Sequence, residues 1–107
     1  MPPSSPPKPE CVNRLVISGT LNQIETLRYS PAGVPIAEAV VHHRGSQTLA
    51  NQARQVECEL TVQASGSLAN QLTQLTVGTQ VKLEGALNRR SVNSRQLILI
   101  LNRIEKE

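Results

Sequence analysis

The chain has 107 residues, enough for one domain with a modest core, and a mild formal net charge of +3. Only two cysteines are present and no apolar run spans a membrane, which argues against a disulfide framework and a membrane protein. The N-terminus also lacks the regions of a signal peptide. We therefore expect a cytoplasmic protein.

Catalysis and cofactor binding are not indicated by the residues present. The chain has no aspartate, no phosphate-binding glycine loop and no Ser/His/acid arrangement at a supporting spacing. The neighbouring His42 and His43 point to opposite faces of a predicted strand, and no third ligand stands at metal-site spacing. The sequence predicts a protein that is not an enzyme and holds no metal or other cofactor.

Arginine content and scarce aromatic residues are the informative features of the composition. Eight of the eleven basic residues are arginines, and they cluster around predicted loops. Arginine binds phosphate bidentately and stacks on flat groups better than lysine does. With one tyrosine and no Phe or Trp, stacking of nucleic-acid bases on aromatic rings is mostly excluded.

The chain begins with a proline-rich segment. Residues 1–12 predict a disordered or extended tail before one domain at residues 13–107, because proline blocks both helix and central strand. Asn13–Tyr29 alternates apolar and polar residues and predicts one long strand, with a bulge or bend at Gly19. Ser30–Pro35 then has the proline and glycine of a turn.

The middle of the chain predicts two more strands and a helical connector. Ile36–Arg44 alternates as a second strand, Gly45–Ala53 reads as a polar loop, and Arg54–Gln63 alternates as a third strand. Cys58 falls on the inward face of that strand and is predicted to be a small buried hydrophobe. Ser65–Leu75 breaks the period of two and has apolar residues at helical spacing.

The segment Thr79–Ile104 predicts a hairpin. Its first strand alternates apolar and polar residues, whereas Leu97–Ile104 is apolar on both faces. Between them lies a polar loop, Arg89–Arg95, with three arginines and no acid. Five antiparallel strands with a short helix or irregular segment between the third and fourth predict an all-β OB-fold, a partly open Greek-key barrel.

Pieces of this sequence resemble the bacterial primosomal replication protein N family (PriB). They keep their order and near-constant spacing, and they are Asn13–Thr20, Ser30–Pro35, His43–Arg44, Arg54–Val56, Cys58, Ser65–Gly66, Thr76–Gly78 and Gly85. The resemblance implies a homodimeric OB-fold that binds single-stranded DNA and works with the restart helicase and other primosome proteins in replication restart. General single-stranded DNA-binding proteins share the fold and are the nearest alternative.

The resemblance also implies where DNA is bound. The expected contacts are arginines at the end of the first strand, around the second predicted loop and in the hairpin loop: Arg28, Arg44, Arg54, Arg89, Arg90 and Arg95. Tyr29 is the one conventional stacking candidate, and covering the barrel rim is an equal alternative for it. The family pattern has aromatics where this chain has Glu57 and Gln52, and Glu57 with Glu59 adds negative charge.

Two alternatives follow from these departures. The arginines could form only a solvated face, or the protein could be an interaction module with weak DNA binding of its own. Dimerisation is predicted separately, because a strand that is apolar on both faces needs two covering layers. The predicted interface is the outer face of the last strand, with Ile98 and Ile100, together with Val16 or Val40. Burial under the chain's own Ser65–Leu75 helix is the rival explanation.

Overall fold

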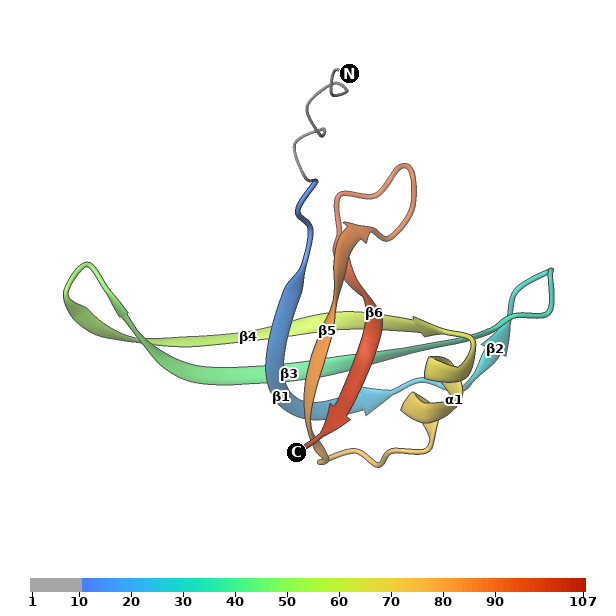
Figure 1. Cartoon of the computed structure of the whole chain (residues 1–107), viewed down its shortest axis with the longest axis horizontal. Coiled ribbons are helices and arrows are strands. Elements are labelled where there is room, and N and C mark those ends of the chain that lie inside the picture. Colours follow the sequence, from blue (N-terminus) through green and yellow to red (C-terminus); the bar gives the residue numbers. More distant parts are fainter. Residues whose placement is uncertain (1–10) are drawn as a thin grey trace, which may run out of the picture.

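The computed structural model describes residues 11–107, so the first ten residues of the predicted tail lie outside the described part. It contains six strands and one helix, in the order β1 (Leu15–Ile24), β2 (Arg28–Tyr29), β3 (Pro35–Leu49), β4 (Gln52–Ser65), α1 (Ser67–Thr73), β5 (Gln80–Arg89) and β6 (Leu97–Lys106) (Figure 1). The sheet order is β1-β5-β6-β4-β3-β2, and β1 also pairs with β3. This second pairing closes the sheet into a barrel, and the predicted OB-fold is confirmed.

One of the strand pairings within the barrel is parallel. Strand β4 meets β6 in parallel at two register pairs, Val62 with Leu99 and Gln63 with Ile100, while the other pairings are antiparallel. The inward side chains of the barrel strands and of α1 make one core of fully or nearly fully buried residues: Leu21, Ala37, Ala39, Val41, Val62, Ala64, Ala69, Leu72, Val81, Leu83, Leu99, Leu101 and Ile104. Aliphatic side chains thus fill the barrel without any aromatic ring.

The first strand is shorter than predicted. The expected single strand Asn13–Tyr29 is wrong, because β1 ends at Ile24 and the two-residue β2 follows a break. Strand β1 passes from β5 to β3 at Thr20, which pairs with both, and a register shift follows between Leu21 and Gln23. Gly19 has a different role from the predicted bulge: a Cβ there would collide with the carbonyl oxygen of His42. Glycine is therefore needed where the two backbones approach closely.

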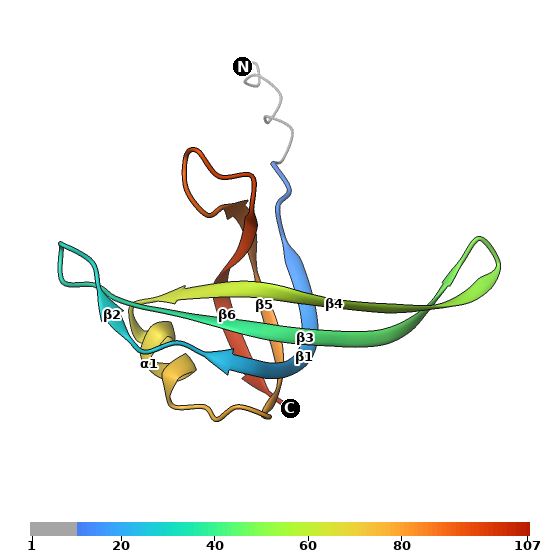
Figure 2. The same cartoon turned by 180° about the vertical axis from the view of Figure 1, so that it is seen from behind.

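A long hairpin replaces the predicted polar loop at Gly45–Ala53, so that prediction is wrong. Strands β3 and β4 pair without a register shift until a two-residue turn at Ala50 and Asn51, whose φ angles are 52° and 64°. Two left-handed residues are typical of the turns that fit the twist of a hairpin. We call residues 44–57 the β3–β4 arm, and it extends from the barrel in both views (Figures 1 and 2).

The arm also explains a wrong burial prediction. Cys58 is exposed, although its side chain follows the same face of β4 as the buried Val62. At Cys58, next to the base of the arm, strands β3 and β4 already extend beyond the core. The face of β4 that is buried at Val62 therefore has nothing to cover it at Cys58. The predicted helix is present, shortened to α1.

The predicted hairpin of Thr79–Ile104 is present as β5 and β6. A bulge interrupts their register at Glu84 and Gly85, and a Cβ at Gly85 would collide with the carbonyl oxygen of Ile100. Close backbone approach again requires glycine. The β5–β6 loop, residues 90–96, stands at the end of the barrel opposite the chain's C-terminus (Figure 1).

Candidate nucleic-acid interface

The six predicted arginines lie on three separate protrusions of the barrel. All six are exposed: Arg28 on β2, Arg44 and Arg54 on the β3–β4 arm, and Arg89, Arg90 and Arg95 at the β5–β6 loop. In Figure 1 the arm points to the left, β2 and its turn lie to the right, and the loop stands at the top. The structure therefore spreads the positive charge over the molecule, apart from Arg28 and Arg90, whose side chains converge on Glu38.

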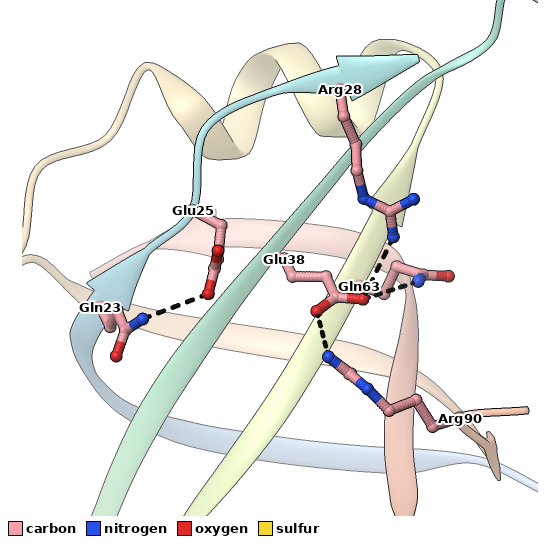
Figure 3. Close-up of polar contacts among 6 residues, drawn as sticks. All are labelled: Gln23, Glu25, Arg28, Glu38, Gln63 and Arg90. Atoms are coloured by element: carbon pink, nitrogen blue, oxygen red, sulfur yellow. Dashed lines mark hydrogen bonds and ion pairs between the residues drawn. The ribbon is translucent and has the colours of Figure 1, made fainter. Parts of the chain in front are cut away.

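Two of these arginines meet at one carboxylate, in what we call the Glu38 cluster (Figure 3). Arg90 donates from Nη2 to Glu38 Oε1 at 2.7 Å, and Arg28 donates from Nη2 to Oε2 at 3.4 Å. Gln63 on the neighbouring strand donates to the same Oε2 at 3.1 Å. The Glu38 side chain is 12% exposed, against 59% for Arg28 and 39% for Arg90. Sequence reasoning missed this role of Glu38.

Glu38 begins a row of outward side chains along the β3–β4 pair, which we call the outer row. Its members face one another across the two strands: Glu38 with Gln63, Val40 with Thr61, His42 with Glu59, and Arg44 with Glu57. Arg54 is opposite Gln47 instead, on the other face of the arm. Because side chains alternate along a strand, Arg44 and Arg54 cannot contact one ligand from the same face.

Each carboxylate of the outer row has a donor. His42 Nε2 lies 2.8 Å from Glu57, and the Asn22 side chain donates to Glu59 at 2.7 Å. The guanidinium of Arg44 donates to the Gln55 amide oxygen, from Nε at 2.6 Å and Nη2 at 3.0 Å. These contacts leave Glu57 and Glu59 on the exposed surface, as the sequence predicted, and they oppose phosphate binding there.

Within the described residues, the β5–β6 loop has two restrained arginines, Arg89 and Arg90, and one unrestrained arginine, Arg95. Arg89 donates from Nη1 to the Val92 carbonyl at 2.8 Å, and the Arg90 backbone N–H donates to the Gln96 carbonyl at 2.9 Å, which closes the loop at its base. Among residues 11–107, no hydrogen bond or ion pair involves the side chain of Arg95 or Arg54. An open hollow of about 360 Å³ lies beside the loop and is lined in part by Arg89 and Val92.

Tyr29 presents an accessible ring at the end of β2. Its side chain is 65% exposed, and its backbone pairs with Pro35 across the short ribbon. A ring this exposed is available to stack on a base. It stands near Arg28, the residue before it, so stacking and phosphate binding could be combined there.

The four residues predicted for a dimer interface have different environments. Val16 is 42% exposed, Val40 and Ile100 are half-buried, and Ile98 is 1% exposed within the single chain. Ile98 therefore has no surface left to offer a second subunit. The rival cover, α1, contacts β6 at its other end, where Gln71 donates to the Ile104 carbonyl at 3.1 Å.

Val16 stands among charged side chains on the outer face of β1, β5 and β6. Arg14 donates to Glu84 from Nε at 2.9 Å and from Nη2 at 3.2 Å. This hydrogen bonding from Arg14 lowers the pKa of Glu84, and the carboxylate in turn raises the pKa of Arg14. This face therefore carries both positive and negative side chains and is not a positive patch.

No helix within residues 11–107 has both the length and the apolar character of a membrane span. In the same described residues, no three or more His, Cys, Asp or Glu side chains lie together in a group that could hold a metal ion. The two cysteines, Cys11 and Cys58, are free and exposed.

The closed barrel, its long arm and its arginine-bearing loop define an OB-fold of the single-strand binding type. A family model described as "Another single-strand binding protein family" matches residues 13–103. Replication restart protein PriB of Photorhabdus laumondii is 40% identical over 77 residues, covering 71% of this chain and 73% of that protein. PriB of Erwinia tasmaniensis is 36% identical over 98 residues, covering 82% and 93%. The chain belongs to the PriB family of replication restart proteins, within the single-strand binding proteins.

Solved structures agree with this assignment. PriB from Ralstonia solanacearum is 32% identical with a TM-score of 0.84, covering 91% of this chain and 99% of that one. The single-strand binding domain from Synechococcus, at 24% identity and a TM-score of 0.70, covers 90% and 97% and shows the same fold. The predicted family is confirmed. The family model is named for single-strand binding and the relatives are named as replication restart proteins, so the prediction that the chain is not an enzyme is also confirmed.

Proposed function

We propose that this protein binds single-stranded DNA as an accessory protein of the primosome and acts in replication restart with the restart helicase, in the cytoplasm. The observation that carries the proposal is the set of exposed arginines on three protrusions of a PriB-family barrel. Each guanidinium has N–H groups free to bind a phosphate. The proposed contacts are Arg28, Arg44, Arg54, Arg89, Arg90 and Arg95, with Tyr29 stacking.

Charge should dominate the binding energy over stacking. Only one aromatic ring is available, and each stacked base is worth about 1–3 kcal/mol. If roughly three to five phosphates are neutralised per protomer, log affinity falls with log salt at a slope of about −2 to −3.5. A fluorescence titration with oligo(dT) over a range of salt concentrations measures this slope. Binding that does not depend on salt, or that is absent below millimolar protein, would refute the proposal.

The β5–β6 loop can be tested with a charge-matched pair of triple variants. Replacing Arg89, Arg90 and Arg95 by alanine should weaken binding to all single-stranded sequences alike and flatten the salt slope by about 2. The control removes three positive charges from the outer face of β1, β5 and β6, which line a separate hollow: R14A, K82A and R103A. Equal effects of the two triples would show that only net charge matters.

A second candidate function is a primosome interaction module with feeble intrinsic DNA binding. The outer row favours it, because Glu57 and Glu59 are exposed on the surface that would meet the strand. This candidate predicts tight helicase binding and almost no DNA binding by the protein alone. Titrating DNA with this protein, and then with this protein plus a restart helicase, separates the two candidates.

We also propose a homodimer. Val16 is the exposed apolar residue among those predicted, with Val40 and Ile100 half-buried, while Ile98 is already covered. Light scattering at micromolar concentration tests the proposal, and a V16E variant should lower the mass toward that of a monomer if Val16 is buried between subunits. A monomer mass for the unchanged protein would refute the homodimer.

A further inference from the structure

Glu38 contacts two of the arginines that the proposed function assigns to DNA binding. We propose that Glu38 restrains the affinity of this protein for polyanions, because its carboxylate holds Arg28 and Arg90, and that removing its charge tightens binding. For DNA this inference rests on the proposed function. The restraint itself concerns any polyanion that the two guanidinium groups could reach.

The carboxylate is the fixed member of the Glu38 cluster. Glu38 is 12% exposed and accepts a hydrogen bond from Gln63, its direct partner across the β3–β4 pair. The arginines are the exposed members and reach it from elsewhere, Arg28 from the two-residue β2 and Arg90 from the start of the β5–β6 loop (Figure 3). A phosphate must therefore share the guanidinium groups with Glu38 or draw them away from it.

The charges of the cluster show the size of the restraint. Two guanidinium groups and one carboxylate leave a net charge of one, so Arg28 and Arg90 together offer a strand about as much charge as one free arginine. Drawing an arginine from an exposed ion pair costs at most about 1 kcal/mol, which corresponds to roughly fivefold in affinity. Arg90 should account for the larger share, because its contact is shorter and less exposed than that of Arg28.

A purely positioning role for Glu38 would have the opposite sign, and the backbone argues against it. The Arg90 N–H donates to the Gln96 carbonyl at 2.9 Å, which closes the loop independently of Glu38. Arg28 is held by the pairing of β2 with β3, opposite Ile36. Both arginines would stay at the same surface without the carboxylate, with more of their N–H groups free.

Glu38→Gln tests the proposal, with Glu105→Gln as the matched control. Each variant removes one negative charge from an ion pair with arginine, but Glu105 pairs with Arg103 on the outer face of β1, β5 and β6. We expect E38Q to bind oligo(dT) about three- to fivefold more tightly at low salt, with a salt slope steeper by about 0.7. E105Q should change the affinity less than about twofold, because a distant exposed charge is screened.

Two further measurements identify the cause. In a background that lacks Arg28 and Arg90, as R28Q/R90Q, E38Q should gain no more than E105Q gains. Elution from immobilised heparin reports the same restraint without DNA, and E38Q should elute at higher salt than E105Q. Thermal unfolding checks that each variant is folded. If E38Q does not fold, E38A replaces it in the same measurements.

The outcomes separate this proposal from the proposed function. Equal gains for E38Q and E105Q, a gain that persists in R28Q/R90Q, or weaker binding by folded E38Q would each overturn the restraint. Later elution of E38Q from heparin, together with no DNA binding by any variant, would support the restraint and refute the proposed function.

Discussion

Replacing Glu57 by tyrosine tests whether the missing stacking platform limits this protein. Glu57 lies in the outer row directly opposite Arg44, on an exposed part of the arm, and its carboxylate contacts His42. A tyrosine there would remove a negative charge and add a ring on the face where the sequence lacks one. Glu57→Gln removes the same charge without adding a ring, so it isolates the charge.

The expected sizes of the two effects differ. Removal of one exposed repulsive charge is worth about 1 kcal/mol or less, so Glu57→Gln should tighten binding by no more than about fivefold. A ring that stacks on one base adds about 1–3 kcal/mol, which is roughly a further five- to 150-fold for Glu57→Tyr. The exposure of the Glu57 side chain, 53%, leaves room for a base to approach.

Salt dependence separates the two contributions in one assay. Oligo(dT) titrations from low to high salt should give the two variants the same slope, because they have the same charge. The tyrosine variant should keep its advantage when the line is extrapolated to 1 M salt, where phosphate contacts contribute little. If Glu57→Tyr binds no more tightly than Glu57→Gln at any salt concentration, no base stacks over this part of the arm and the missing platform does not limit binding.

Three predictions concern the barrel itself. Gly85→Ala should destabilise it by at least about 2 kcal/mol in urea unfolding, because a Cβ would meet the Ile100 carbonyl; an unchanged midpoint would contradict the bulge geometry. Leu83→Ala should cost about 2–5 kcal/mol, since Leu83 is fully buried in the core, and a smaller loss would indicate that the core can collapse around it. The pKa of Glu84 is lowered by Arg14, so this pair stabilises the fold above the ordinary pKa of a carboxyl group, and the contribution is lost as pH falls through the lowered value. The urea midpoint of Glu84→Gln, measured against pH, should not show that loss. A curve parallel to that of the unchanged protein would count against a stabilising role of the Arg14–Glu84 ion pair.

The barrel was predictable because its strands are half-buried. Ile36–Arg44 and the first strand of the Thr79–Ile104 hairpin alternate apolar and polar side chains, and a closed sheet requires that alternation. The arm was not predictable from the same signal. Between Gly45 and Ala53 both faces of the strands are solvated. The alternation of apolar and polar residues therefore disappears from the sequence, although the backbone continues as strands. The turn at Ala50 and Asn51 also lacks the glycine that usually marks such a hairpin.

The candidate site was predictable as a set of residues but not as an arrangement. The arginines could be named from composition and from the family pattern. The relative faces of Arg44 and Arg54 could not be predicted, because an irregular loop between them carries no parity. The two-residue turn of the structure fixes them on opposite faces. Glu38 falls on the same predicted face as His42 and Arg44, yet its contact with Arg90 joins residues 52 positions apart in sequence. Local alternation places a residue on a face and says nothing about which distant loop reaches it.

The arginines differ in how available they are to an anion, because some lie beside carboxylates of the outer row and others do not. On the barrel, Glu38 offsets the charge of Arg28 and Arg90, and on the arm Glu57 lies opposite Arg44, so a phosphate chain gains little at these arginines. Arg95, at the β5–β6 loop, has no such carboxylate within the described residues. A strand bound mainly at this loop would contact the barrel weakly and leave it readily. If the protein passes its strand to a restart helicase, as proposed above, the carboxylates that weaken binding would also favour that release.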